Sequence, residues 1–222
     1  MRTRIKVCCI ENETESAMAV RAGAAALGLV SHMPSGPGVI GEDAIADIAR
    51  AAPPAVGTFL LTSATEAEPI IEQQRRCHVN TLQLVDKPAP GTHEALRKAL
   101  PGVALVQVIH VEDEAALGEA RGIAPYVNAV LLDSGKPGAA VKELGGTGRV
   151  HDWSVSRQIV GALDIPVFLA GGLNAGNVAD AIQAVRPYGV DLCTGVRTDG
   201  ALDADKLGRF FTACAAADQA FL

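Results

Sequence analysis

The 222-residue sequence predicts an α/β protein, with residues 1–222 folded as one domain, a closed (β/α)8 barrel of the TIM-barrel type. Two observations predict this fold. Short apolar runs rich in β-branched residues alternate with Ala-rich segments of helical period, in eight strand–helix pairs. Most strand starts recur about every 24 residues, which suits one strand, one helix and two short loops. A doubly wound open sheet is the alternative, since a sequence does not show whether the sheet closes.

The strands are assigned to the apolar runs and the helices to the segments between them. We expect strands near Arg4–Ile10, Leu27–Ser31, Val56–Leu61, Thr81–Val85, Val103–Val108, Val127–Leu132, Val167–Ala170 and Val190–Cys193. We expect helices near Glu13–Ala22, Glu42–Ala51, Ala64–Cys77, Gly91–Ala99, Glu112–Gly122, Trp153–Ala162, Ala175–Val185 and Asp203–Ala216. Asn12 is a capping residue type for the first helix, and Glu15 is placed to complete a capping box. Asn174 and Asp203 are capping types for the last two helices.

The connection after the sixth strand is longer than the others. The excess lies between Asp133 and Trp153, and Asp152 is placed to cap the helix that follows. Long inserts in barrels fall on the loops after strands, where ligands bind. We therefore expect the functional site at the C-terminal ends of the strands.

The composition argues against several classes of protein. Apolar residues make up 49% of the chain and charged residues 20%, which predicts a packed core rather than disorder. A net charge of −6 without a basic stripe argues against nucleic-acid binding. The start MRTRIKVCCI is too brief for a signal peptide, and no apolar run reaches membrane-spanning length. The five cysteines form no C-x-x-C pair, so we expect reduced thiols in a cytoplasmic protein.

Two kinds of side chain at strand ends can transfer protons. Asp133 closes the apolar run Val127–Leu132, and burial there raises the pKa of a carboxyl toward the range of a general acid. Cys8 and Cys9 close the first strand, where a thiol with a lowered pKa can act as a general base. Alternation along the strand turns only one of the two inward, and a small buried core residue is the plainer interpretation of either.

Glycine-rich turns follow three consecutive strands, the sixth, seventh and eighth. Barrels often bind a phosphate behind strands seven and eight, on free backbone N–H groups. We therefore predict phosphate binding by Gly146, Thr147, Gly171, Gly172, Thr194 and Gly195.

Two histidines also follow strands, His32 and His110. A lone histidine is usually structural, and the chain has no H-x-H or H-x3-H spacing, so we assign no metal. Both stay candidates for contact with a substrate.

Five motifs, taken in order and spacing over nearly the whole chain, resemble the phosphoribosylanthranilate isomerase family of tryptophan biosynthesis. They are Lys6-Val-Cys-Cys9, Leu131-Leu-Asp-Ser134, Gly145-Gly-Thr-Gly148 with Asp152-Trp153, Ala170-Gly-Gly-Leu173 with Asn177-Val178, and Gly189-Val-Asp191 with Thr194-Gly-Val196. The resemblance implies a barrel enzyme, monomer or homodimer, that needs no cofactor. It implies an Amadori rearrangement of a phosphorylated small molecule, an N-glycosidic aminoaldose phosphate. Cys8 would take the C2′ proton, and Asp133 would protonate the ring oxygen.

The sequence departs from the family pattern at four positions. The family's arginine for the anthranilate carboxylate, in a segment like K-S-P-R, is Gly38 here, and the histidine of its Q-L-H-G is Val85. Cys9 replaces a glycine, and the final S-G-V-E ends in Arg197, which is a further candidate for contact with substrate or phosphate. The alternative is therefore a diverged paralogue that acts on, or only binds, a different phosphorylated small molecule.

Overall fold

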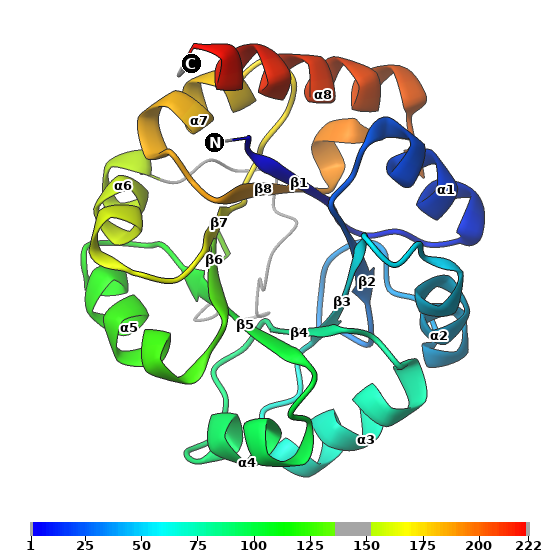
Figure 1. Ribbon diagram of the computed structural model, residues 1–222, viewed down its shortest axis with the longest axis vertical. Coiled ribbons are helices and arrows are strands. Elements are labelled where there is room, and N and C mark those ends of the chain that lie inside the picture. Colours follow the sequence, from blue (N-terminus) through cyan, green and yellow to red (C-terminus); the bar gives the residue numbers. More distant parts are fainter. Residues whose placement is uncertain (1, 136–151, 221–222) are drawn as a thin grey trace.

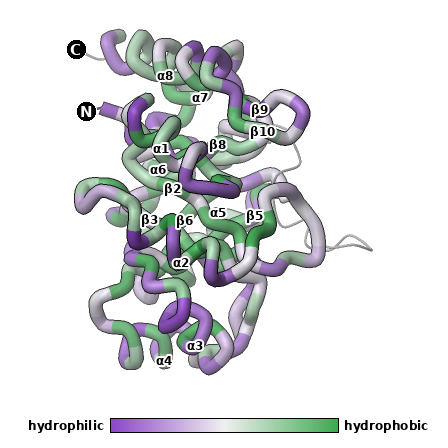
Figure 2. Tube along the Cα trace, turned by 90° about the vertical axis from the view of Figure 1, so that its right-hand side faces the viewer, coloured by the Kyte–Doolittle hydropathy of each residue, from purple (hydrophilic) through white to green (hydrophobic). Residues whose placement is uncertain are grey.

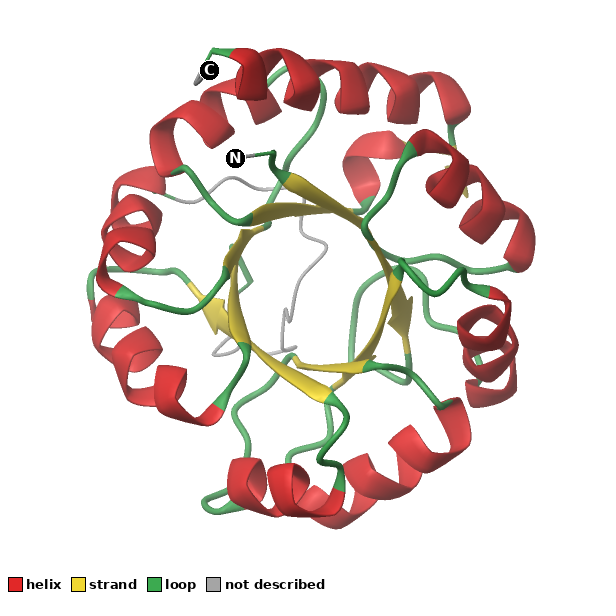
Figure 3. Cartoon of the chain, viewed as in Figure 1, coloured by secondary structure: helices red, strands yellow, loops and turns green. Residues whose placement is uncertain are grey.

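The computed structural model describes residues 2–135 and 152–220, which form a closed barrel of parallel strands with helices around it (Figures 1 and 3). The strands are β1 (Arg4–Val7), β2 (Ala26–Val30), β3 (Gly57–Thr62), β4 (Thr81–Leu84), β5 (Ala104–His110), β6 (Ala129–Asp133), β7 (Val167–Leu169) and β8 (Gly189–Leu192). The main helices are α1 (Glu13–Ala22), α2 (Glu42–Ala51), α3 (Ala67–Cys77), α4 (Thr92–Ala99), α5 (Ala115–Ile123), α6 (Trp153–Ala162), α7 (Val178–Val185) and α8 (Ala204–Gln219).

Pairing of the first strand with the last closes the barrel. β1 lies parallel to β8, with Arg4 opposite Gly189 and Val7 opposite Leu192. Every other strand pairs with its sequence neighbour, so the order around the barrel is the order along the chain. The predicted (β/α)8 barrel is therefore confirmed, and the open doubly wound sheet is wrong.

Apolar side chains fill two regions, one between the strands and the helices and one inside the barrel. Because strand side chains alternate, β1 places Ile5 and Val7 toward the helices and the intervening Lys6 inside the barrel, where it is fully buried. Figure 2 shows hydrophobic stretches along the strands and more hydrophilic ones over the outer helices and loops. Within the described residues, no helix is long and apolar enough to cross a membrane.

Each predicted strand and helix is present, and the differences lie at their ends. β1 stops at Val7 rather than Ile10, because Cys9 has a left-handed backbone with φ 60°. α7 begins at Val178 rather than Ala175. The Asn174 side chain accepts a bond from Gly176 N–H instead of capping the helix, and Asn177 Oδ1 accepts one from Asn174 N–H. Such local side-chain bonds compete with the first helical turn.

The predicted caps of three helices are present. Asn12 Oδ1 accepts a hydrogen bond from Glu15 N–H at 3.0 Å, and Asp152 and Asp203 cap α6 and α8 through their side chains. The reciprocal half of the capping box differs: the Glu15 carboxylate accepts from Glu11 N–H and not from the cap residue itself. Shorter elements complete the chain: the 3-10 turns η1 (Ala124–Tyr126) and η2 (Thr194–Val196), and the hairpin β9 (Arg197–Thr198) with β10 (Ala201–Leu202).

Candidate active site

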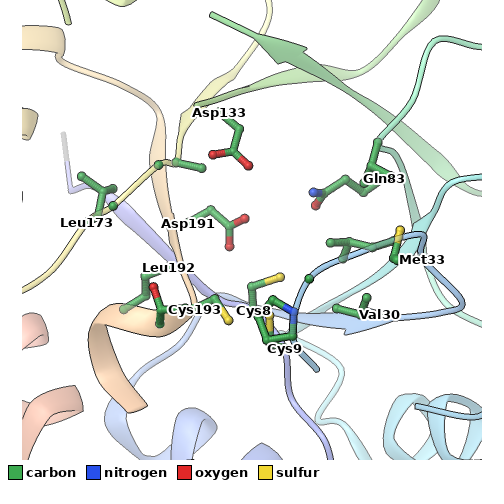
Figure 4. A pocket seen from close by; sticks show the side chains of 18 of the residues that line it. Cys8, Cys9, Val30, Met33, Gln83, Asp133, Leu173, Asp191, Leu192 and Cys193 are labelled. Atoms are coloured by element: carbon green, nitrogen blue, oxygen red, sulfur yellow. The ribbon is translucent and has the colours of Figure 1, made fainter. Parts of the chain in front are cut away.

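A pocket with about 720 Å³ of empty space opens at the C-terminal ends of the strands (Figure 4). Its lining comes from residues at the ends of β1, β4, β6 and β8 and from the loops that follow β2 and β7. This is the end of a barrel that carries active sites, as expected from the sequence.

Cys8 and Asp133 both line this pocket, and Figure 4 shows both side chains pointing into it. Burial raises the pKa of the Asp133 carboxyl, and the Ser134 N–H, which donates to Oδ1 at 2.7 Å, opposes the rise. The pKa of the Cys8 thiol is lowered, chiefly by a hydrogen bond with Cys9, while burial opposes this and the Lys6 charge assists it. These shifts favour a protonated carboxyl and a thiolate, the states that an acid and a base need.

Both cysteines at the end of β1 face the pocket, so the expectation that only one does so is wrong. The strand ends at Val7, and the left-handed backbone of Cys9 breaks the alternation that the expectation assumed. The Cys9 thiol also contacts Cys193, and this hydrogen bond, followed by the one with Cys8, raises the pKa of Cys9 well above its usual value. Of the two thiols, Cys8 is the one prepared to act as a base.

A buried ion pair lies beside Cys8. Lys6 Nζ is 2.9 Å from Asp191 Oδ1, and the Lys6 side chain is 0% exposed. Burial by itself lowers the pKa of Lys6, but Asp191 and Cys8 more than offset this and raise it. For Asp191, burial raises the pKa and Lys6 opposes the rise. Figure 4 shows the Asp191 carboxyl between Cys8 and Asp133.

Sequence reasoning missed this pair, although a signal for it was present. Lys6 stands between the apolar residues Ile5 and Val7 and two residues before Cys8, and that spacing places the Lys6 and Cys8 side chains on one face. A charge on that face needs a buried partner. Gly28 on β2 makes room for both groups: a Cβ there would lie 2.6 Å from Cys8 Sγ and 2.9 Å from Lys6 Nζ.

Of the residues predicted to bind phosphate, those within the described parts of the chain lie together at the pocket. Gly171, Gly172 and Thr194 line the pocket, and the two glycines have φ values of 89° and 63°. Gly195 lies behind them, where a Cβ would be 2.1 Å from the Leu173 carbonyl oxygen. Backbone N–H groups in such turns can bind an anion. Gly146 and Thr147 lie outside the described residues.

Arg197 is placed away from the pocket lining, which corrects its candidate role as a substrate contact. Its guanidinium is buried and makes two bonds with the Glu15 carboxylate, at 3.0 and 2.8 Å. It also donates to the Cys9 carbonyl oxygen. Burial opposes ionisation of Glu15, but bonds from Arg197, Leu202 N–H and Glu11 N–H lower its pKa. Arg197 therefore fastens the β1–α1 connection to the segment after β8.

Neither candidate histidine is brought into the described lining of the pocket. The His32 side chain is exposed. His110 Nε2 bonds with the Val85 carbonyl oxygen at 3.0 Å, and His110 pairs in register with Asp133 on the neighbouring strand. Burial has the larger effect on the pKa of Asp133 and raises it, while the electrostatic interaction with the nearby His110 ring lowers it.

Three of the four positions that depart from the family pattern, Cys9, Gly38 and Val85, lie at or just behind the pocket wall, and the fourth, Arg197, does not line it. Val85 lies on the wall, and so does Gln83, whose buried Oε1 has no hydrogen-bond partner within the described residues. Such an oxygen can accept a bond from a ligand hydroxyl or amine. Gly38 packs against Cys9 just behind the wall. Within the described parts of the chain, no group of three acidic, histidine or cysteine side chains is arranged to hold a metal.

A closed barrel with a thiol and a carboxyl opposed across one pocket, beside turns suited to an anion, is an enzyme of the acid–base class. The model of the N-(5'phosphoribosyl)anthranilate (PRA) isomerase family matches residues 5–213. The N-(5'-phosphoribosyl)anthranilate isomerase of Haloferax volcanii is 37% identical, with coverage of 96% of this chain and 93% of the relative.

Solved structures agree with the sequence relatives. The phosphoribosyl anthranilate isomerase of Thermotoga maritima has a TM-score of 0.81 and 28% identity, with coverage of 96% of this chain and 99% of that one. A second isomerase structure, in complex with reduced 1-(o-carboxyphenylamino)-1-deoxyribulose 5-phosphate, has a TM-score of 0.78 and 26% identity, with the same coverage. The chain belongs to the N-(5'-phosphoribosyl)anthranilate isomerase family, an isomerase family that the sequence motifs already resembled.

Proposed function

We propose that the chain is a phosphoribosylanthranilate isomerase of tryptophan biosynthesis, with Cys8 as general base and Asp133 as general acid. The observation that carries the proposal is the pair of opposite pKa shifts in one pocket: the Cys8 thiol shifted down and the Asp133 carboxyl shifted up. Paired groups whose surroundings push their pKa values apart indicate which is the base and which the acid.

The reaction needs two proton transfers on opposite sides of the sugar. Asp133 donates its proton to the ring oxygen as the C1′–O bond breaks, and the amine nitrogen forms a double bond to C1′. The Cys8 thiolate then takes the C2′ proton, which gives an enolamine. Return of a proton to C1′ and loss of the hydroxyl proton at C2′ give the aminoketose, with no net gain or loss of atoms.

The remaining lining groups have supporting roles in this proposal. The ammonium of Lys6 lies beside Cys8 and stabilises the thiolate, and Asp191 holds Lys6 in place. The turns at Gly171–Gly172 and Thr194–Gly195 bind the substrate phosphate through backbone N–H groups, which fixes the sugar between acid and base. Because the five thiols are free, we place the activity in the cytoplasm. We also propose that the chain acts as a monomer or homodimer.

Turnover of freshly prepared phosphoribosylanthranilate tests the proposal, followed as the decay of anthranilate-type fluorescence. We expect wild type to be active, and Cys8→Ala and Asp133→Asn each to reduce kcat by about 10²–10⁴-fold. Cys214→Ala, in a helix far from the pocket, is the matched thiol control and should keep wild-type turnover. An inactive wild type, or full activity in Cys8→Ala and Asp133→Asn, overturns the assignment.

A further inference from the structure

Cys9 and Gly38 occupy overlapping space at the edge of the pocket. A Cβ on Gly38 would lie 2.4 Å from Cys9 Cβ, 2.8 Å from Cys9 Cα and 3.3 Å from Cys9 Sγ. Gly38 also has φ +76°, a backbone that L side chains rarely adopt. A side chain at position 38 therefore meets both a steric contact and an unfavourable backbone.

The Cys9 side of this contact has little freedom to move away. Its carbonyl accepts a bond from the Arg197 guanidinium, which the Glu15 carboxylate holds with two further bonds. The flanking residues are fixed to neighbouring strands, since Cys8 N–H donates to the Leu192 carbonyl at 2.8 Å and Ile10 N–H donates to the Gly28 carbonyl at 3.0 Å. These bonds also keep Cys9 at its left-handed φ of 60°, which is unfavourable for a non-glycine residue.

The Gly38 side is fixed as well. Immediately after it, Val39 forms a β-bridge with Val30, and Ile40 N–H donates to the Val30 carbonyl at 3.0 Å. Immediately before it, Ser35, Gly36 and Pro37 line the pocket. The contact with Cys9 therefore sets the position of the loop that forms this edge.

The charged side chains that line the described part of the pocket are Asp133 and Asp191, and both are acids. Around the loop edge the lining is apolar or small, with Val30, Met33, Pro37 and Val85. With no side chain at position 38, the loop presents no cation there.

We propose that Cys9 and Gly38 together determine substrate specificity. A side chain at position 9 requires glycine at position 38. With this pair, the edge of the pocket selects the amine part of the substrate by shape rather than by charge. The coupling itself is a steric claim. The specificity part rests on the proposed isomerase function.

Thermal unfolding of Cys9→Gly, Gly38→Ala and the double variant tests the coupling. Gly200→Ala is the matched control, because Gly200 has φ +84° and nothing within 4 Å of its Cβ position, so it reports the backbone effect alone. We expect Gly38→Ala to lower Tm by roughly 5–10 °C, clearly more than Gly200→Ala does. Cys9→Gly removes two of the three close contacts, so in the double variant Cys9→Gly/Gly38→Ala it should restore at least half of the extra fall in Tm that Gly38→Ala shows over Gly200→Ala. In Cys9→Gly/Gly200→Ala, where the two residues do not touch, the changes in Tm should be additive. Additivity of Cys9→Gly with Gly38→Ala overturns the coupling.

The specificity part is tested with an arginine, whose charge can reach the pocket once residue 9 is small. The kcat/KM ratio for phosphoribosylanthranilate over the N-phosphoribosyl derivative of aniline, which lacks the carboxylate, is compared among the variants. In Cys9→Gly/Gly38→Arg we expect this ratio to rise about tenfold above that of Cys9→Gly. Gly38→Arg alone should have a low Tm and little turnover. A stable and fully active Gly38→Arg overturns the proposal. If wild type turns over neither compound, the proposed function and the specificity part fail, and the Tm measurements still decide the coupling.

Discussion

Two carboxyl groups of one pocket differ in what lies beside them. Asp191 touches a buried ammonium at 2.9 Å, whereas Asp133 has a backbone N–H at 2.7 Å and His110 on the adjacent strand. Burial raises the pKa of both carboxyls, but Asp191 has an ammonium at hydrogen-bond distance that opposes the rise, whereas the closest opposing group at Asp133 is the Ser134 N–H. The same residue type can therefore hold Lys6 in place at one position and store a proton at the other.

This difference predicts opposite effects of the same substitution. Asp133→Asn keeps an oxygen for the Ser134 N–H and removes the need to bury a charge, so Tm at neutral pH should rise by about 2–4 °C. Asp191→Asn leaves Lys6 buried without a counter-charge and should lower the free energy of unfolding by about 3–5 kcal/mol. Thermal and denaturant unfolding of both variants measures this. A fall in stability for Asp133→Asn, or none for Asp191→Asn, contradicts this account.

The pH dependence of stability isolates Asp133. Burial raises its folded-state pKa, so between the ordinary carboxyl pKa and the raised one the folded state binds more protons than the unfolded state. Wild-type stability should therefore fall as pH rises through this window. The difference in unfolding free energy between Asp133→Asn and wild type should grow with pH across the same window and then level off. A difference that stays constant over pH would show that Asp133 titrates normally.

The thiols differ in reactivity for a related reason. The pKa of Cys8 is lowered, whereas burial raises the pKa of Cys77 and of Cys214 to about 12. Because the thiolate is the nucleophile, iodoacetamide at pH 7–8 should label Cys8 first, and loss of turnover should follow that labelling. Mass spectrometry of peptides at several times measures the order. Cys9, with its raised pKa, is the neighbouring control, and labelling of Cys9 ahead of Cys8 would reverse the assignment of the base.

At the scale of elements, the turns after β7 and β8 depend on each other. A Cβ on Gly195 would lie 2.1 Å from the Leu173 carbonyl oxygen, so the start of η2 packs directly against the β7–α7 loop. This contact brings Thr194 close to Gly171 and Gly172 at the pocket wall. A shift of either turn separates the N–H groups proposed to bind phosphate.

Gly195→Ala should therefore weaken anion binding and the fold together. We expect unfolding free energy to fall by about 1–3 kcal/mol, because the new methyl group must push the loop aside. The rise in Tm that inorganic phosphate gives wild type should largely disappear. Gly118→Ala, in α5 with open space around it, is the control and should gain roughly 0.5–1 kcal/mol while keeping the phosphate response. A full phosphate response in Gly195→Ala would separate these turns from anion binding.

The same elements show what sequence could and could not predict. Strands and helices were predictable because their signals are local: apolar runs such as VNAVLL, helical periods and the caps Asn12, Asp152 and Asp203. The positions of Cys8 and Asp133 followed from strand ends. The end of β1 was not predictable, because it depends on Arg197, 188 residues away from the Cys9 carbonyl that it holds. The partners of Lys6 and Glu15 are long-range in the same way, 185 and 182 residues away.

The whole molecule is a ring in which β1 and β8 close the barrel and carry Cys8 and Asp191 side by side. Cys8 N–H donates to the Leu192 carbonyl at 2.8 Å, so the residue that carries the proposed catalytic thiol is attached to the last strand as well as the first. A second tie between the two ends of the described chain lies at the start of β1. Thr3 donates to the Asp218 carboxylate of α8 through its N–H at 2.9 Å and its hydroxyl at 2.6 Å. Figure 2 shows the start of the chain beside the end of α8.

Loss of this tie should destabilise the closed ring without touching the chemistry. Asp218→Ala removes both acceptors, and Thr3→Val removes the hydroxyl donor while keeping the size of the side chain. We expect Asp218→Ala to lower the free energy of unfolding by about 1–3 kcal/mol and Tm by roughly 3–10 °C, and Thr3→Val by about half as much.

Because both variants lose the same contact, the double variant should be no less stable than Asp218→Ala alone. Gln219→Ala, an exposed neighbour on α8, should stay within about 0.5 kcal/mol of wild type. Turnover at 25 °C should be unchanged in all of them, since the tie lies at the opposite end of the strands from Cys8 and Asp133. Additive losses in the double variant, or a fall in kcat without a fall in Tm, would mean that Thr3 and Asp218 do not act as a closure of the barrel.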